Sequence, residues 1–179
     1  MLRHLRVPFS RSLVIFVTQN KKIMSIEVGT AAPGFTLLDS DKNKISLSDY
    51  KGKNVLLLFY PQAFTSVCTR ELCAVRDDIG RYNNSTASVL GISVDSVFTL
   101  KQYKEVQGYN FPLLSDFNKE VSAAYDCLYD EWILGMKGVS KRASFVIDGE
   151  GIIRFVEILE SANDYPDFEG INKTLDSLS

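Results

Sequence analysis

The segment Phe59–Cys73, FYPQAFTSVCTRELC, marks a point where a buried strand gives way to a helix. An unbroken apolar run, NVLLLFY at residues 54–60, leads into it, and Pro61 ends that run. A continuous apolar run bounded by breakers is typical of a central strand covered on both faces. Apolar side chains then recur with helical spacing as far as Ile79, and Gly80 falls near the end of the pattern. The segment therefore predicts a strand, a tight turn and a helix.

Strand and helix patterns alternate on both sides of this segment. Strands are expected at 35–38, 44–47, 87–93, 142–147 and 152–157, with helical segments at 48–53, 97–107, 119–125 and 168–178. The sequence DGEG at 148–151, between the last two strands, is a strong hairpin signal. This order predicts an α/β fold in which a mixed central sheet has helices on both faces. We expect a single domain over residues 25–179.

The composition is that of an ordinary globular protein, with 45% hydrophobic and 23% charged residues. It contains no apolar run of about 18 residues, the length that a membrane-spanning helix needs. The net charge is −2, but residues 1–24 hold five basic residues and no acid, which leaves 15 basic and 22 acidic residues elsewhere. An acidic domain without a basic stripe argues against nucleic-acid binding. We therefore expect neither nucleic acid nor membrane as a partner.

The basic stretch 1–24, MLRHLRVPFSRSLVIFVTQNKKIM, has three interpretations. It lacks acids, as a mitochondrial transit peptide does. A secretory signal fits less well, because the apolar run at 13–17 is short and no small-residue cleavage site follows. Alternatively, Met24 is the true start of the protein. We expect a cytoplasmic protein, or a mitochondrial or other organellar one if residues 1–24 are a genuine transit peptide.

Three cysteines (Cys68, Cys73 and Cys127) and one histidine (His4) limit the available chemistry. A low, odd number of cysteines does not suit a secreted disulfide scaffold and favours a reducing compartment. Because His4 lies in the basic tail, a Cys–His or Ser–His pair inside the domain is excluded, and so is a histidine-bearing zinc site. Two cysteines and a distant third give too few ligands for zinc, so we expect neither metal nor cofactor. A nucleophile here must be activated by something other than imidazole.

Cys68 is the candidate nucleophile because it falls at the start of the predicted helix. The free N–H groups and partial positive charge of a helix N-terminus stabilise a thiolate and lower the pKa of the thiol. Thr65, three residues earlier, has a hydroxyl that can cap the turn and also hydrogen-bond the sulfur or a bound oxygen. The carboxyl ends of strands in open α/β sheets are common ligand sites. The alternative is that Cys68 is a small buried hydrophobic residue, as most free cysteines are.

The pattern Pro61-x-x-x-Thr65-x-x-Cys68 resembles the active-site motif of the peroxiredoxins, the AhpC/TSA superfamily. The similarity covers about residues 26–160, in which three further blocks stand in the expected order: APGF at 32–35, FPLLSD at 111–116 and RASFVID at 142–148. Within the family, the chain is most similar to the bacterioferritin-comigratory and AhpE-like branches. The resemblance implies a thioredoxin-like fold and the thiol-dependent reduction of hydrogen peroxide or organic hydroperoxides.

The same resemblance implies a role for each site residue. Cys68 would be the peroxidatic cysteine that becomes a sulfenic acid, and Pro61 would shield it from solvent and overoxidation. Thr65 would hold the peroxide, and Arg142 would complete the pocket with a permanent positive charge. Donors from these side chains, and from the N–H groups of Val67 and Cys68, would stabilise charge on the leaving oxygen. Without the resemblance, Arg142 is better interpreted as part of a surface salt bridge.

The role of Cys73 depends on the branch. In the comigratory branch, a cysteine at this position resolves the sulfenic acid as an intramolecular disulfide, which a thioredoxin-like reductant recycles. In the AhpE-like branch, an external thiol does so and Cys73 would be a reduced core residue. In an intact helix, Cα atoms five residues apart are roughly 8–9 Å from each other, beyond the disulfide limit of about 7 Å, so residues 66–74 would have to unwind. Cys127 is expected to be structural.

Other functions use the same residues. A peroxide sensor or redox relay would pass the oxidised state of Cys68 to a partner protein. A thioredoxin-like binding module would have no reactive thiol at all, and a disulfide reductase is disfavoured because the C-x-x-C spacing is absent. The sequence leaves open the preferred peroxide, the thiol reductant, and whether the protein is a monomer or a homodimer. Phe64 and Trp132 are expected to be partly exposed, near the active-site loop and a dimer contact respectively.

Overall fold

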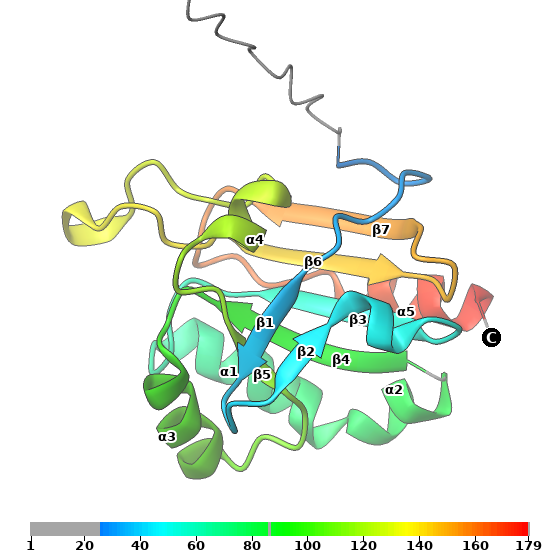
Figure 1. Ribbon diagram of the computed structural model, residues 1–179, viewed down its shortest axis with the longest axis horizontal. Coiled ribbons are helices and arrows are strands. Elements are labelled where there is room, and N and C mark those ends of the chain that lie inside the picture. Colours follow the sequence, from blue (N-terminus) through cyan, green and yellow to red (C-terminus); the bar gives the residue numbers. More distant parts are fainter. Residues whose placement is uncertain (1–25, 86, 179) are drawn as a thin grey trace, which may run out of the picture.

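The computed structural model describes residues 26–85 and 87–178 (Figure 1). The tail 1–24, with its three interpretations, lies outside the described residues. The strands are β1 (Thr36–Asp39), β2 (Lys44–Ser46), β3 (Asn54–Phe59), β4 (Ala87–Ser93), β5 (Leu113–Ser115), β6 (Arg142–Ile147) and β7 (Ile153–Leu159). The helices are α1 (Ser66–Asp77), α2 (Ile79–Asn84), α3 (Val97–Gln107), α4 (Glu120–Ala124) and α5 (Phe168–Ser177), with 3₁₀ turns at Leu47–Tyr50 and Ile133–Gly135.

The strands form one mixed sheet in the order β2-β1-β5-β4-β3-β6-β7. The pairs β3–β4 and β4–β5 are parallel, and the other four pairs are antiparallel. Every residue of β3 is buried, as the continuous apolar run predicts for a central strand. Its side chains alternate between two cores, with Leu56 and Leu58 on one face and Val55, Leu57 and Phe59 on the other. The predicted mixed sheet is confirmed.

Helices cover both of these cores (Figure 1). The core on the Leu56 face includes side chains from α1, α2, α3 and α5, among them Leu72, Leu100 and Ile171. The core on the other face includes Val121 of α4. Among the described residues, no helix has the length and apolar character needed to cross a bilayer. The layered arrangement buries the central strands β3 and β6 completely and leaves residues of the outer strands β1, β2 and β7 partly exposed.

Two details differ from the sequence prediction. The helix expected to run towards Gly80 ends at Asp77, and a second helix, α2, begins at Ile79 and contains that glycine. The break falls at Asp78, whose backbone leaves the helical region at φ −109° and ψ 23°, and α2 then buries Tyr82 in the core. The second difference is β5, a three-residue strand that the sequence pattern did not predict. Such a short strand has too few residues to show a periodic pattern.

Asp148 closes the turn of the β6–β7 hairpin, where the sequence DGEG predicts one. Its Oδ1 accepts hydrogen bonds from the N–H groups of Glu150 and Ile152, both at 2.9 Å, and its Oδ2 accepts one from Arg154 Nε at 2.6 Å. Burial acts to raise the pKa of Asp148, but the bonds from Ile152, Arg154 and Glu150 outweigh it and hold the pKa below its ordinary value of 3.8. The ionised carboxylate is therefore part of the folded hairpin.

Asp148→Ala is expected to lower the free energy of unfolding by about 1–3 kcal/mol at neutral pH, because it leaves these donors without their acceptor. A carboxyl whose pKa is lower in the folded state contributes stability above its unfolded pKa and loses it as pH falls through the folded pKa. Urea unfolding should therefore show a wild-type advantage at pH 7 that shrinks below pH 3.8. The exposed neighbour variant Glu150→Ala is the control, and a pH-independent advantage would contradict this account.

Candidate active site

The end of β3 and the start of β6 lie side by side, because the two strands are antiparallel neighbours with Phe59 opposite Ala143. The turn after β3 leads into α1, so the N-terminal end of this helix faces the first residue of β6. Cys68 and Arg142, which are 74 residues apart in sequence, are thereby brought into contact. The fold assembles the site from three elements: the turn after β3, the first turns of α1 and the start of β6.

Arg142 is completely buried and binds three groups. Its Nη2 donates to Cys68 Sγ at 3.4 Å and to the carbonyl of Ala162 at 2.9 Å. Its Nη1 forms an ion pair with the carboxylate of Glu71, which is also completely buried. The interpretation of Arg142 as a surface ion pair is therefore wrong. A positively charged donor held by two further partners therefore stands beside the sulfur.

Glu71 was missed in the sequence, although a signal was present. The buried stripe of α1 contains Cys68, Leu72 and Val75, and Glu71 is buried with them. These four positions follow the i, i+3, i+4, i+7 spacing of a single helix face. An acid on an otherwise apolar face must find a cation or be destabilising, because an unpaired charge is costly to bury. The pattern thus indicates a buried partner for Glu71, though not that the partner is Arg142.

The start of α1 presents Cys68 as the third residue of the helix, after Ser66 and Val67. The first N–H groups of a helix have no partner within it, and they carry the positive end of the helix dipole. A negative charge at Cys68 is therefore favoured by this helix end as well as by Arg142. Both influences act in a buried environment, since Cys68 is only 2% exposed.

Thr65 precedes α1 with an extended backbone, at φ −87° and ψ 151°, but its hydroxyl makes no capping bond to the residues that the structure describes. It donates instead to the carbonyl of Gln62 at 2.9 Å. The expectation that this hydroxyl caps the turn is therefore wrong, because its oxygen accepts no hydrogen bond from a described N–H group of α1. The oxygen keeps its lone pairs and can accept a hydrogen bond from an incoming hydroxyl group.

The loop between β3 and α1 carries Pro61, which is buried, and Phe64, which is 51% exposed, as expected. Phe64 has a left-handed backbone with φ 62°, a conformation that costs a non-glycine residue about 1–3 kcal/mol. Its ring packs on Tyr103 of α3, with 4.8 Å between centroids. The hydroxyl of Tyr103 is 2.9 Å from that of Thr69, next to Cys68. The loop and the first turn of α1 thus share one support on α3.

The other two cysteines have different surroundings, and none of the three, all of which lie in the described residues, is in a disulfide. Cys73 is half-buried, and its Sγ lies 3.7 Å from Gln107 Oε1 at the end of α3. Cys127 is fully buried, and its thiol donates to the carbonyl of Ser122 at 3.4 Å. Burial raises the pKa of Cys127 well above its ordinary value, and the charges of Asp116 and Asp126 raise it further. Cys127 is therefore held as an unreactive thiol.

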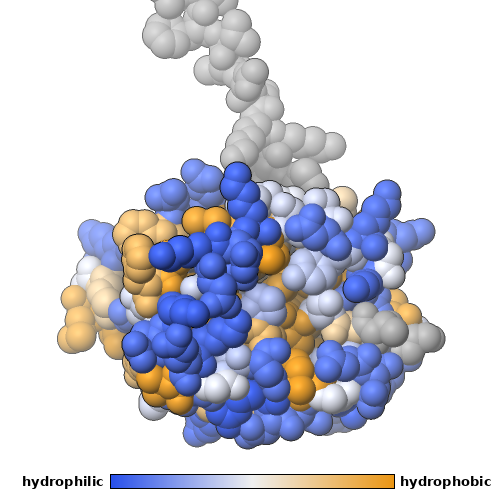
Figure 2. Space-filling view, turned by 60° about the horizontal axis from the view of Figure 1, so that its bottom comes forward, coloured by the Kyte–Doolittle hydropathy of each residue, from blue (hydrophilic) through white to orange (hydrophobic). Residues whose placement is uncertain are grey.

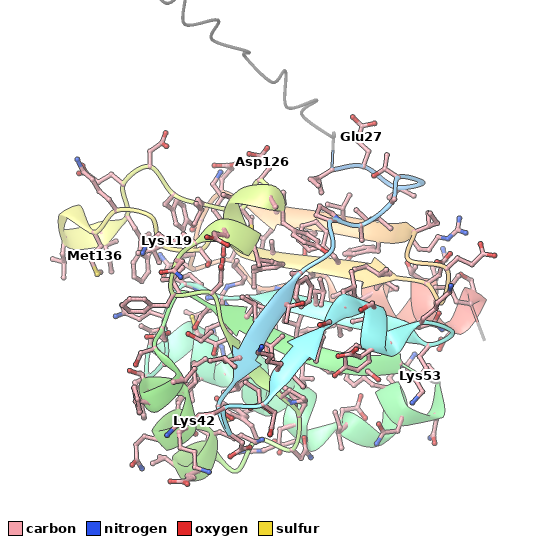
Figure 3. The ribbon with its side chains drawn as sticks, viewed as in Figure 1. Glu27, Lys42, Lys53, Lys119, Asp126 and Met136 are labelled. Carbon is pink, nitrogen blue, oxygen red and sulfur yellow. The ribbon has the colours of Figure 1, made fainter. Side chains whose placement is uncertain are left out.

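A projecting arm over residues 129–138 carries Trp132, which is half-buried, and Met136, which is labelled in Figure 3. The ring of Trp132 stacks on Tyr129, with 6.4 Å between centroids, and Leu134 is 93% exposed.

On the face shown in Figure 2, apolar side chains lie in separate patches among hydrophilic ones. Within residues 26–85 and 87–178, no cluster of three or more His, Cys, Asp or Glu side chains could hold a metal ion.

The mixed sheet thus carries a buried thiol near a helix N-terminus and beside a buried guanidinium, the arrangement that the sequence predicts for a thiol-dependent oxidoreductase. The AhpC/TSA family model matches residues 28–156. Alkyl hydroperoxide reductase E of Mycobacterium tuberculosis is 41% identical over 136 residues, which cover 74% of this chain and 86% of that protein. The mitochondrial thioredoxin-dependent peroxide reductase of Drosophila melanogaster is 35% identical over 167 residues, which cover 88% and 68%.

Solved structures agree with this assignment. Peroxidoxin BcpB from Mycobacterium tuberculosis superposes with a TM-score of 0.76 at 30% identity, over 87% of this chain and 99% of that one. The reduced 2-Cys peroxiredoxin of Plasmodium vivax gives a TM-score of 0.74 at 30% identity, over 83% and 80%. The chain belongs to the AhpC/TSA family, the peroxiredoxins, and has their thioredoxin-like fold. It is an oxidoreductase that acts on peroxide.

Proposed function

We propose that this protein is a thiol peroxidase in which Cys68 attacks hydrogen peroxide or an organic hydroperoxide. The thiolate sulfur displaces one oxygen of the peroxide as the O–O bond breaks, and a sulfenic acid forms on Cys68. The leaving oxygen takes up a proton and departs as water or an alcohol. The observation that carries the proposal is the 3.4 Å contact between Arg142 Nη2 and Cys68 Sγ, both of which are buried. This contact places a positively charged donor beside the sulfur that would act as the nucleophile.

The surrounding groups support the transition state of this displacement. Negative charge grows on the leaving oxygen, and fixed donors that point there stabilise it without reorganisation. Arg142 is fixed by Glu71 and by the Ala162 carbonyl, and we assign the first N–H groups of α1, which have no partner within the helix, as further donors to the leaving oxygen. We assign the acceptor of the peroxide hydroxyl to the Thr65 oxygen, because its own proton is bound to Gln62.

Pro61 completes the proposed site as a shield. It is buried directly after β3, in the loop that leads to Cys68. Proline has no N–H group, so its ring adds apolar surface without adding a donor that water would have to satisfy. A drier pocket strengthens the interaction of the sulfur with Arg142, because charges attract more strongly where the effective dielectric constant is low.

We further propose that Cys73 resolves the sulfenic acid as a Cys68–Cys73 disulfide, with loss of water, and that a thioredoxin-type reductant reduces it. Both residues lie in α1, and their thiols have different partners, Arg142 and Gln107. In an intact helix their Cα atoms stand roughly 8–9 Å apart, beyond the disulfide limit of about 7 Å. Resolution therefore requires the N-terminal half of α1 to unwind. The name of the Drosophila relative supports the choice of reductant.

Cys73→Ser is expected to leave the first oxidation of Cys68 unchanged and to abolish the intramolecular disulfide. The sulfenic acid then persists and is open to further oxidation by excess peroxide. Mass spectrometry after one equivalent of hydrogen peroxide would show a Cys68–Cys73 link in the wild type and a dimedone adduct on Cys68 in the variant. Cys127→Ser is the matched control and should form the link. A linked wild-type helix with unchanged helicity would contradict the unwinding.

The overall function is tested by turnover. Reduced protein, thioredoxin, thioredoxin reductase and NADPH should consume NADPH when hydrogen peroxide or a small organic hydroperoxide is added, and not before. Oxidation of Cys68 without turnover, followed by transfer of the disulfide to a second protein, would instead assign a peroxide sensor or relay.

The compartment depends on residues 1–24, outside the described residues, and we propose the cytoplasm unless that segment directs import.

A further inference from the structure

Asp95, which lies between β4 and α3, reaches across to the loop that precedes α1. Its Oδ2 accepts a hydrogen bond from the N–H of Ala63 at 2.8 Å, across 32 residues of sequence. The same oxygen accepts a bond from the hydroxyl of Ser93 at 2.8 Å. The backbone of Asp95 is fixed too, because its carbonyl accepts the hydroxyl of Ser115 at 2.6 Å. Asp95 is thus bound to β4 through its carboxylate and to β5 through its backbone carbonyl.

The loop that Asp95 binds contains an unfavourable backbone conformation, which neighbouring contacts must stabilise. Ala63 is buried and lies between Pro61 and Thr65, the two loop residues of the proposed peroxide pocket. Phe64, next to Ala63, has the unfavourable left-handed backbone with φ 62°. Such a conformation persists only when surrounding contacts fix it. The Ala63 N–H bond to Asp95 and the packing of Phe64 on Tyr103 are two such contacts.

We infer that Asp95 is a positioning residue for the peroxide pocket. By holding the Ala63 N–H, its carboxylate sets Thr65 and Pro61 in place over Cys68, although it does not itself touch the sulfur. The inference rests on the proposed peroxidase function. It adds a residue outside the Pro61–Cys68 motif and makes the β4–α3 junction part of the active site's support.

Two electrophiles separate this role from general structural support. Hydrogen peroxide needs a thiolate and also the oxygen site that Thr65 and Pro61 form. Iodoacetamide needs the thiolate alone, because it reacts at carbon and has no peroxide oxygens to be held. Loss of a positioning residue should therefore slow oxidation of Cys68 by peroxide while leaving alkylation of Cys68 unchanged. Loosening of the whole site would change both rates together.

The experiment measures both rate constants by stopped flow and mass spectrometry in the wild type and in Asp95→Ala. We expect the peroxide rate of the variant to fall by about tenfold to a hundredfold, the scale of small misplacements in a site, with the iodoacetamide rate close to wild type. Asp95→Asn keeps an oxygen that can accept from Ala63 N–H, so it should restore most of the peroxide rate. If Asp95→Ala does not fold, Asp95→Ser replaces it, because the shorter hydroxyl cannot reach Ala63.

Asp41→Ala is the matched control. Asp41 binds Lys101 and Lys104 of α3, so its loss removes ties to the same helix without touching the loop. It should leave both rates unchanged. Wild-type peroxide reactivity in Asp95→Ala, an equal fall in both rates, or failure of Asp95→Asn to restore the rate would each overturn the inference. A wild-type protein whose Cys68 does not react with peroxide would instead overturn the proposed function.

Discussion

Cys68→Ser is expected to abolish peroxide reduction, with a fall in turnover of about 10⁶-fold, the scale measured when an enzyme loses its nucleophile. A serine hydroxyl is a much weaker nucleophile than a cysteine sulfur and needs a general base, which the described part of the site does not place beside position 68. The variant has no sulfur at position 68 to form a sulfenic acid, so Cys73 has nothing to resolve. The measurement is hydrogen peroxide consumption with thioredoxin, thioredoxin reductase and NADPH.

Cys127→Ser is the control for this substitution. It removes a thiol of the same chain that is fully buried, bonded to the Ser122 carbonyl and held protonated. It should keep turnover, apart from any loss of stability, which thermal unfolding of both variants would measure. Peroxide turnover that survives in Cys68→Ser and is lost in Cys127→Ser would contradict the assignment of the nucleophile.

Arg142→Met is expected to lower the rate of Cys68 oxidation by about 10²–10³-fold, the typical loss when a fixed donor to the transition state is removed. It removes the charge beside Cys68 Sγ and leaves Glu71 buried without its cation. The unpaired carboxylate should cost about 3–5 kcal/mol of stability. Stopped-flow oxidation by hydrogen peroxide and urea unfolding measure the two effects.

The double variant Arg142→Met/Glu71→Met separates these two effects. It replaces the buried ion pair with apolar side chains, an exchange that is often neutral or stabilising. The stability of the fold should therefore return, while the oxidation rate should stay as low as in Arg142→Met. If the rate returns with the stability, Arg142 acts only through the fold and its proposed role in the displacement is wrong.

The fold could be predicted from the sequence where the pattern was long. The apolar run of β3 and the helical spacing of α3 stand within a residue of their expected bounds. The break at Asp78 could not be predicted, because the apolar periodicity continues to Ile79 and the change of direction depends on burying Tyr82. The strand β5 was too short to show a pattern and depends on pairing with β4 and β1.

In the candidate site, too, the sequence predicts local features but not contacts between residues that are far apart in the chain. The position of Cys68 at a helix start is a local feature that the sequence predicts, whereas the burial of Arg142 depends on the antiparallel pairing of β3 with β6. Glu71 and Asp95 contribute through contacts across 71 and 32 residues of sequence, which local patterns do not encode. The hydroxyl of Thr65 donates to the Gln62 carbonyl and does not cap α1, an outcome that depends on the conformation of the loop and not on the residue type alone.

The most direct test of the account is the reaction of the reduced protein with one equivalent of hydrogen peroxide, followed by mapping of every cysteine by mass spectrometry. The account predicts that Cys68 is oxidised first, that it is trapped by dimedone at early times, and that it is later found linked to Cys73 with Cys127 still reduced. A Cys68 thiol that survives intact while the peroxide persists would contradict the central claim that this residue is the peroxidatic nucleophile.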